Sequence, residues 1–370
     1  MTAPRELRVY RLGQVEYEDG LRLQELFGQA RARGLVPDTL LLLEHPPVLT
    51  LGRAAKRENI TTPPEVLARM GVEVHETTRG GDVTYHGPGQ IVGYPIFLLS
   101  PDRQDVRRYV RSVEEGLIRA LARFGIEAGR IDGWAGVWLG RKGEPDARKI
   151  GAIGVHLSRW LTSHGFALNV RTNLAHFGLI VPCGIKEAGV TSMALELPQA
   201  PELPQVEQAL AESFADVFGA TLSFGGYDMR TVGVAVIRGR GEDTRALVLR
   251  RQPMQGGFWQ IITGEMEPGE SPAACAAREV FEETGCRLHV EDLGYRNSFA
   301  LGESLPPRVV EAHGFVARWE EGGEVRLAPE EHDAHEWLPI PEALERMPFK
   351  GLRETLRRAA AHAGWGRGTA

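Results

Sequence analysis

Apolar residues recur along the chain at two different spacings, and the spacing distinguishes helices from strands. Between residues 106 and 124 they lie three and four positions apart, which predicts a helix with one buried face. Residues 206–218 repeat this pattern and predict a second helix. Short apolar runs predict strands at residues 40–44, 150–157 and 165–170, and the first of these stops at His45-Pro46-Pro47.

The pattern breaks at Phe224-Gly225-Gly226, and new strands are expected at residues 232–237 and 246–250. A chain of 370 residues exceeds what one ordinary hydrophobic core organises. We therefore expect two domains, residues 1–224 and 225–370. Both mix strands and helices without a regular βαβ alternation, so the predicted fold class is α+β.

The composition of the chain gives no support to several classes of function. The net charge of -6 gives no sign of nucleic-acid or anionic-membrane binding. The first residues lack the apolar run of a secretory signal, and the most apolar stretch, residues 39–43, is too short to span a bilayer. Three cysteines do not make a disulfide framework, so a cytoplasmic location is expected.

The second half contains a cluster of spaced acidic residues. Ser271-Pro272 predicts the start of a helix and Gly285 its end. Glu279, Glu282 and Glu283 are three and four residues apart and would share one face of that helix. Like charges so placed repel, and a hard cation such as Mg²⁺ would turn the repulsion into binding. A solvated acidic helix face is the alternative.

The series Gly264, Glu270, Arg278-Glu279, Glu282-Glu283 and Gly285 resembles the Nudix box. Cys286 departs from it mildly, since an aliphatic residue is usual there. The resemblance implies a Nudix α/β/α sandwich that hydrolyses a nucleoside or other diphosphate-containing small molecule. It implies Mg²⁺ held by Glu279, Glu282 and Glu283, with Arg278 steadying the cluster through Glu270. Glu330 or Glu331 could add a ligand or base, or simply lie in an acidic loop, and residues 258–260 weakly resemble pterin triphosphate hydrolases.

The first half contains a glycine-rich stretch, residues 79–90, whose backbone N–H groups could approach a ligand closely. Lys149 precedes a strand of small residues, and Cys183 lies in the turn Val181-Pro182-Cys183-Gly184. Taken singly, Cys183 could be a buried apolar residue and Lys149 a surface charge, and the glycine-rich stretch could be a structural turn.

Together, RGGDVTYHGPGQ, KIGAIGV, SHGFALNV and PCGI followed by Val190-Thr191-Ser192 resemble the lipoyl(octanoyl) transferase family over about residues 8–222. The resemblance implies a lipoate/biotin transferase-like domain that uses Cys183 as nucleophile and Lys149 as its catalytic partner, with no cofactor. It also implies an acyl-binding slot formed by Arg79, Gly80, Gly81, Asp82, Val83, Thr84, Tyr85, His86, Ala152, Ile153, Gly154, Gly165, Phe166 and Ala167.

The implied partners are octanoyl-acyl carrier protein as donor, and lipoyl domains of 2-oxoacid dehydrogenase complexes and the glycine cleavage H protein as acceptors. Arg103, Arg107, Arg108 and Arg111 form a basic helical patch that could dock such acidic proteins or simply be solvated. One rival hypothesis is an ATP-dependent lipoate or biotin ligase, which would not need Cys183. It would pair with a Nudix module that senses a nucleotide without cleaving it.

Overall fold

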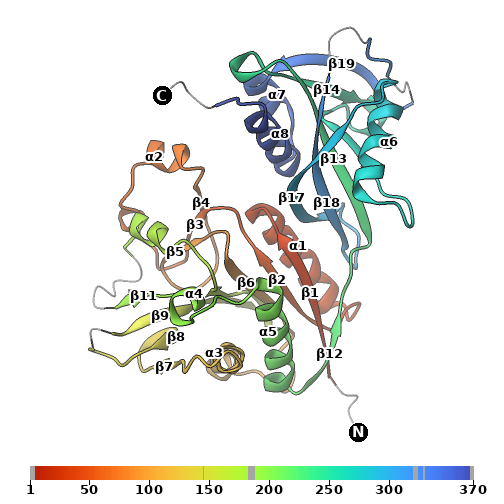
Figure 1. Cartoon of the computed structure of the whole chain (residues 1–370). Helices are drawn as coiled ribbons and strands as arrows, with labels where there is room; N and C mark the ends of the chain where they lie inside the picture. Colours follow the sequence, from red (N-terminus) through yellow and green to blue (C-terminus); the bar gives the residue numbers. More distant parts are fainter. Residues whose placement is uncertain (1–4, 145, 182–187, 320–323, 328–329, 367–370) are drawn as a thin grey trace. The chain divides into compact units, whose positions relative to one another are not determined.

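The computed structural model describes residues 5–144, 146–181, 188–319, 324–327 and 330–366. The chain divides into two compact units, residues 1–226 with 300–308 and residues 227–299 with 309–370 (Figure 1). Gly225 donates its N–H to Val9 O at 2.9 Å, so the first unit reaches past the predicted end at residue 224. Within the described residues, no helix has the length and apolarity needed to cross a membrane.

The first unit is built on a nine-stranded mixed sheet in the order β12-β1-β2-β6-β10-β9-β8-β7, with β11 added beside β9. The strands are β1 (Arg5–Gln14), β2 (Asp38–Glu44), β6 (Gln90–Ile96), β7 (Gly129–Ile131), β8 (Trp134–Leu139), β9 (Arg148–Ser158), β10 (Leu161–Asn169), β11 (Gly189–Val190) and β12 (Ala220–Phe224). Residues 40–43 of β2 form an unbroken apolar run, as expected of a strand that is covered on both faces. Leu40 and Leu42 enter the main core, and Leu41 and Leu43 are equally buried.

Helices α3 (Val106–Ala122) and α5 (Leu203–Phe218) supply one face of that core, and α1 (Tyr17–Ala32) contacts β6 and β10. Asp105 caps α3 by accepting the N–H of Arg108 at 2.9 Å. A small sheet, β4-β3-β5, stands apart from the large one. Its strands are β3 (Val48–Leu51), β4 (Glu73–Glu76) and β5 (Val83–His86). The short helix α2 (Pro64–Arg69) packs on this sheet through Leu67, whereas α4 (Met193–Glu196) contributes Met193 to the main core.

The second unit is a seven-stranded sheet in the order β15-β14-β13-β18-β17, with β16 beside β13 and β19 beside β14. Its strands are β13 (Met229–Arg238), β14 (Arg245–Arg251), β15 (Trp259–Gln260), β16 (Ile262–Glu265), β17 (Val290–Leu301), β18 (Arg308–Arg318) and β19 (His332–Pro339). Helix α6 (Pro272–Thr284) packs on the face with Val234 and Val236. Helices α7 (Ile340–Arg346) and α8 (Lys350–His362) pack on the face with Ala235 and Ile237.

The predicted elements are confirmed with small shifts at their ends. The helix expected at 106–124 is α3 and the helix expected at 206–218 is α5. Helix α6 begins after the N-cap Ser271, with Pro272 at its first position, and ends at Gly285 in the left-handed region. The alternation of faces along β13 places helices on both sides of the second sheet, which is the α/β/α arrangement expected for this half.

Candidate functional sites

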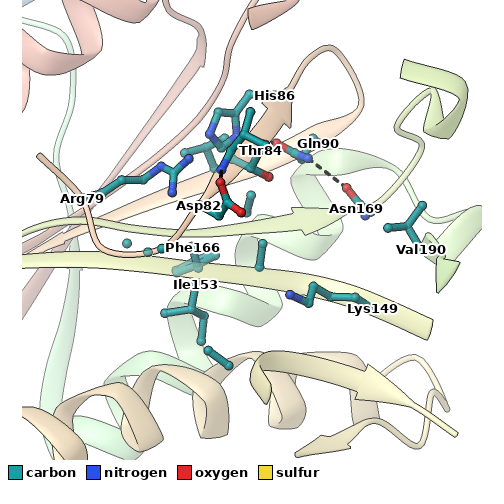
Figure 2. A pocket seen from close by; sticks show the side chains of 18 of the residues that line it. Arg79, Asp82, Thr84, His86, Gln90, Lys149, Ile153, Phe166, Asn169 and Val190 are labelled. Atoms are coloured by element: carbon teal, nitrogen blue, oxygen red, sulfur yellow. Dashed lines mark hydrogen bonds between the residues drawn. The ribbon is translucent and has the colours of Figure 1, made fainter. Parts of the chain in front are cut away.

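A cavity of about 440 Å³ lies within the first unit, and we call it the main cavity. Strands β5, β6, β9 and β10 contribute most of its wall (Figure 2). Thirteen of the site residues expected from the sequence line it: Arg79, Gly81, Asp82, Val83, Thr84, His86, Lys149, Ala152, Ile153, Gly154, Gly165, Phe166 and Ala167. Gly80 and Tyr85 do not line it, and Cys183 lies outside the described residues.

The Tyr85 side chain points away from the main cavity, because successive side chains along β5 point to opposite faces of the sheet. Thr84 and His86 line the main cavity, whereas the Tyr85 ring is buried in the core of the small sheet. There its hydroxyl donates to, or accepts from, Nδ1 of His176 at 2.6 Å. Tyr85 therefore lies outside the main cavity, whereas Thr84 and His86 on either side of it line that cavity.

Lys149 lies on β9, and its side chain points into the main cavity (Figure 2). Its Nζ is 4.6 Å from the centroid of the Trp138 ring, a cation–π contact that favours the charged amine. The backbone of Lys149 pairs with Val190 of β11, the first strand after Cys183 in the sequence. The chain that follows Cys183 thus returns to the side of Lys149.

The glycine-rich stretch is held by the side chains of Asn59, outside it, and Arg79, at its start. Asn59 donates from Nδ2 to both carboxylate oxygens of Asp82, at 3.0 and 2.9 Å. Arg79 is 8% exposed and donates to the carbonyl of Thr50 at 2.6 Å and to the carbonyl of Gly80 at 3.1 Å. These contacts fix the loop as one wall of the main cavity and set a guanidinium in that wall.

Three histidines near the main cavity are held neutral by burial. Burial lowers the pKa of His86 to about 3 and that of His45 to about 4. It also lowers the pKa of His164 to about 4, helped by the charge of Arg79. Nδ1 of His45 donates to the carbonyl of Val15, so its Nε2 accepts the hydroxyl of Tyr94; both distances are 2.7 Å.

In the second unit, α6 brings together the acidic residues expected to hold a metal. Glu279 and Glu283 are buried, while Glu282 is exposed. Gly264 on β16 has a packing role: a Cβ there would lie 1.8 Å from Cδ of Glu279. The absence of a side chain at Gly264 therefore makes the space that the Glu279 carboxylate occupies.

Arg278 neutralises much of this cluster. It donates through Nε and Nη2 to the two oxygens of Glu270, both at 3.0 Å, and through Nη1 to Glu279 at 2.6 Å and Glu282 at 3.0 Å. The hydrogen bonds from Arg278 lower the pKa of Glu270 to about 2. Burial raises the pKa of Glu279, against the opposing effect of Arg278. The sequence expectation that Arg278 reaches the cluster and Glu270 together matches these contacts.

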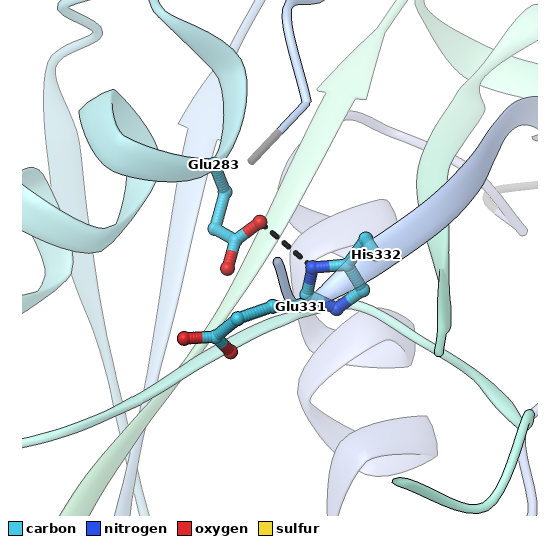
Figure 3. A group of neighbouring side chains, drawn as sticks. All are labelled: Glu283, Glu331 and His332. Atoms are coloured by element: carbon cyan, nitrogen blue, oxygen red, sulfur yellow. Dashed lines mark hydrogen bonds and ion pairs between the residues drawn. The ribbon is translucent and has the colours of Figure 1, made fainter. Parts of the chain in front are cut away.

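Glu283 extends the cluster toward β19. Its Oε2 accepts a hydrogen bond from Nδ1 of His332 at 2.7 Å (Figure 3). Glu283, Glu331 and His332 each offer a ligand atom, and these atoms lie within 4.8 Å of one another. Glu331 also pairs with Arg251. Of this group Glu283 is buried and Glu331 is exposed. Carboxylate oxygens suit a hard divalent cation, so these glutamates fit the expected metal.

Two family models match the chain: the lipoyl protein ligase A/B catalytic domain over residues 16–215 and the NUDIX domain over residues 228–359. An octanoyltransferase of Myxococcus xanthus is 62% identical over 355 residues, covering 96% of this chain and 99% of that protein. The chain belongs to the octanoyltransferase family. Its first domain is the acyltransferase domain, and its second is a Nudix hydrolase domain. The match with the Myxococcus relative covers both domains.

Other relatives match one domain only. An octanoyltransferase of Acidobacterium capsulatum is 51% identical over 222 residues, which cover 58% of this chain and 90% of that protein. The dihydroneopterin triphosphate pyrophosphohydrolase of E. coli matches 36% of this chain and 96% of its own, with 23% identity and a TM-score of 0.32. This weak similarity says nothing of the substrate of the Nudix domain.

Several residues of the octanoyltransferase domain that face the main cavity were not expected from the sequence. They are Tyr17, Gln90, Val92, Tyr94, Trp134, Trp138, His164, Asn169, Phe177 and Val190, among others. Gln90 is the last residue of one family motif and Asn169 is the last but one of another, and these positions were the available signal. The aromatic residues come from segments without any motif, so only the fold brings them to the cavity.

The basic patch on the octanoyltransferase domain is smaller than expected. Arg107, Arg108 and Arg111 line an open groove along α3. Arg103 instead turns inward, where it donates to Asp38 at 2.7 Å and to the carbonyl of Leu98 at 2.8 Å. Arg103 thus belongs to an ion pair in the interior and is no part of the groove.

Proposed function

We propose that the first domain transfers an octanoyl group from octanoyl-acyl carrier protein to a lysine of lipoyl domains, through a thioester at Cys183. The observation that carries this is the position of Lys149 in the main cavity, paired to the strand that follows Cys183. An ammonium near a cysteine favours the thiolate, which is the nucleophilic form. The apolar part of the wall, including Val83, Ile153 and Phe166, suits an aliphatic chain.

Lys149 gives up one proton in the first half-reaction and takes one back in the second, so the two half-reactions balance. The Cys183 thiolate attacks the donor thioester, the carbon–sulfur bond to the carrier breaks, and the leaving thiolate takes a proton from the Lys149 ammonium. The acceptor amine then attacks the Cys183 thioester and gives its proton to the neutral Lys149 amine. Cys183 leaves as thiolate, which restores the starting state without ATP.

The decisive variant is Cys183→Ala. With octanoyl-carrier protein alone, the wild type should gain one octanoyl group by mass spectrometry, located on Cys183, and should transfer it to a lipoyl domain without ATP. The variant should do neither, while hydrolysis by the Nudix domain of the same molecule stays unchanged as a control. Transfer by the alanine variant, or a requirement for ATP, would refute the covalent route and favour a ligase.

For the second domain the proposal is Mg²⁺-dependent hydrolysis of a diphosphate linkage in a nucleotide-like small molecule. Nudix domains generally use divalent metals. Glu279, Glu282 and Glu283 would hold the cation, which when bound neutralises phosphate charge and activates water. Arg278 keeps the buried carboxylates compensated and Gly264 keeps Glu279 in place.

A screen of the full chain with Mg²⁺ tests this, in which product release is followed by chromatography, across nucleoside and pterin triphosphates, sugar diphosphates and dinucleotides. Hydrolysis that requires Mg²⁺ and disappears in Glu283→Gln supports the proposal. Binding of a nucleotide without any release would instead support a sensing module. The expected cytoplasmic location remains a prediction.

A further inference from the structure

Gln90 is the last residue of the motif RGGDVTYHGPGQ, Asn169 is the last but one of SHGFALNV, and the two meet in the wall of the main cavity. Gln90 is the first residue of β6, Asn169 is the last of β10, and the two are paired in the antiparallel register. Nε2 of Gln90 donates to Oδ1 of Asn169 at 2.9 Å (Figure 2). They are only 1% and 5% exposed, so their polar atoms depend on protein partners.

Asn169 uses its other amide atom to hold the chain that follows Cys183. Its Nδ2 donates to the carbonyl of Thr191 at 3.0 Å. The N–H of the same Thr191 donates to the carbonyl of Lys149 at 2.9 Å. A single residue, Thr191, therefore connects the Asn169 side chain to the backbone of Lys149.

His86, which contacts Gln90 on the side away from Asn169, determines the orientation of both side-chain amides. Nδ1 of His86 lies 2.7 Å from Oε1 of Gln90, and it donates because an amide oxygen can only accept. With its oxygen facing His86, Gln90 must present its NH₂ group to Asn169, and it also donates to the carbonyl of Tyr85 at 3.2 Å. Asn169 must then present its own NH₂ group to Thr191. Each group in this row donates to the next, so none can be reversed alone.

We propose that Gln90 and Asn169 are positioning residues for acyl transfer: they fix the segment after Cys183, through Thr191, against the backbone of Lys149. The inference rests on the proposed function, in which Lys149 acts on Cys183. The effect of an ammonium on a thiol falls with their separation, and a misplacement of about 1 Å in a catalytic constellation can cost about a hundredfold in rate. Neither residue needs to touch the reacting atoms for this role.

The test uses the full chain and two variants that interrupt this series of hydrogen bonds at different points. Asn169→Asp keeps the shape and the acceptor for Gln90, but it sets an oxygen against the carbonyl of Thr191. Gln90→Met keeps the length and removes all three hydrogen bonds. The matched control is Thr162→Val, which removes buried hydrogen bonds to Pro95 and Phe97 at the other end of the same two strands, outside the main cavity.

Two measurements separate positioning from stability. The first is the single-turnover rate of octanoyl-Cys183 formation at saturating octanoyl-carrier protein. The second is the pH midpoint of Cys183 alkylation by iodoacetamide, followed on the Cys183 peptide by mass spectrometry. Asn169→Asp and Gln90→Met should each slow acylation by about 10- to 100-fold and move the alkylation midpoint to higher pH. Thr162→Val should leave both unchanged in its folded fraction.

If the folded variants acylate at the wild-type rate with an unchanged alkylation midpoint, the positioning role is refuted. A loss in Thr162→Val equal to that in Asn169→Asp would also refute it, since general destabilisation would then suffice. If Asn169→Asp does not fold, Gln90→Met decides alone, because it removes the hydrogen bond that orients Asn169 without changing Asn169 itself. Failure of the proposed function is recognised separately, since the wild type would then form no octanoyl-Cys183 at all.

Discussion

Gly264 and the buried histidines illustrate how single residues set the chemistry of each domain. Gly264 leaves room for the carboxyl group of Glu279, whose burial raises its pKa while Arg278 compensates its charge. Around the main cavity, His45, His86 and His164 remain neutral because their rings are buried. In both places a local packing detail shifts the pKa of a buried side chain.

Gly264→Ala should reduce Nudix hydrolysis by about 10- to 100-fold, as expected when a group that supports a metal ligand is disturbed. The added methyl group would push the flexible end of Glu279 aside, so the fold itself should survive. Hydrolysis and octanoyl transfer are measured on the same preparation, and transfer should not change. Full hydrolysis by the alanine variant would show that Glu279 does not need its observed position.

The three histidines predict acid sensitivity of the octanoyltransferase domain. Their folded pKa values, about 3 for His86 and about 4 for His45 and His164, lie below the unfolded value of about 6.5. Only the unfolded state binds protons between these limits, so stability falls as pH drops from 6.5 toward 4. Each histidine contributes up to about 1.4 kcal/mol per pH unit there.

His45→Gln should therefore make this pH slope shallower by up to about 1.4 kcal/mol per pH unit. Hydrogen exchange of β6 and β10 peptides between pH 6.5 and 4.5 measures the local unfolding free energy of this domain alone. Equal slopes in wild type and variant would mean that His45 titrates normally in the folded state.

At the scale of elements, the ends of helix α6 are defined by its local sequence, whereas its contact with β19 is formed over a long range in the sequence. Ser271, Pro272 and Gly285 define its ends from local sequence, and its glutamates share a face through helical spacing. His332 on β19 and Glu331 beside it approach Glu283 only because the sheet brings β19 to that helix. The expected cation site therefore depends on one element and its neighbour together.

Mg²⁺ should stabilise the Nudix domain by about 2.7 kcal/mol at a hundredfold excess over its dissociation constant. Glu283→Gln should lose most of this stabilisation and its hydrolysis, yet melt without metal at the wild-type temperature or slightly above. The reason is that glutamine can still accept from His332 while one repelling charge is removed. Melting with and without Mg²⁺ measures this, with Glu354→Gln on α8 as the control, and a Glu283 variant that keeps both responses would contradict a metal role.

At the scale of the whole molecule, the chain is two compact units joined near Gly226. Gly225 belongs with the first unit, because its N–H bonds to Val9 and a Cβ there would lie 2.2 Å from the Tyr10 ring. Each unit has its own hydrophobic clusters. Separate cores are the condition for folding independently.

Fragments 1–226 and 227–370 should each fold, and each should show one cooperative melting transition. The first fragment should retain octanoyl transfer and the second should retain hydrolysis. Calorimetry of each fragment beside the intact chain is the measurement. A fragment that melts without cooperativity would show that the two halves depend on each other.

Local sequence determined much of this protein: the main helices and strands, the ends of α6, the acidic face and the motifs that identify both domains. These features depend on neighbours three or four residues away, or on alternation along a strand, so short windows suffice. The side to which Tyr85 turns also follows from alternation, but choosing between the two faces required the observed sheet.

Only the tertiary structure decided which distant residues meet. Gln90 and Asn169 are 79 residues apart, and Glu283 and His332 are 49 apart, yet each pair is joined by one hydrogen bond. Arg103 resembles its basic neighbours in sequence but pairs with Asp38 because that carboxylate faces it in the fold. Such contacts arise when strand order and helix packing bring separate segments together, and neither is encoded in a local spacing.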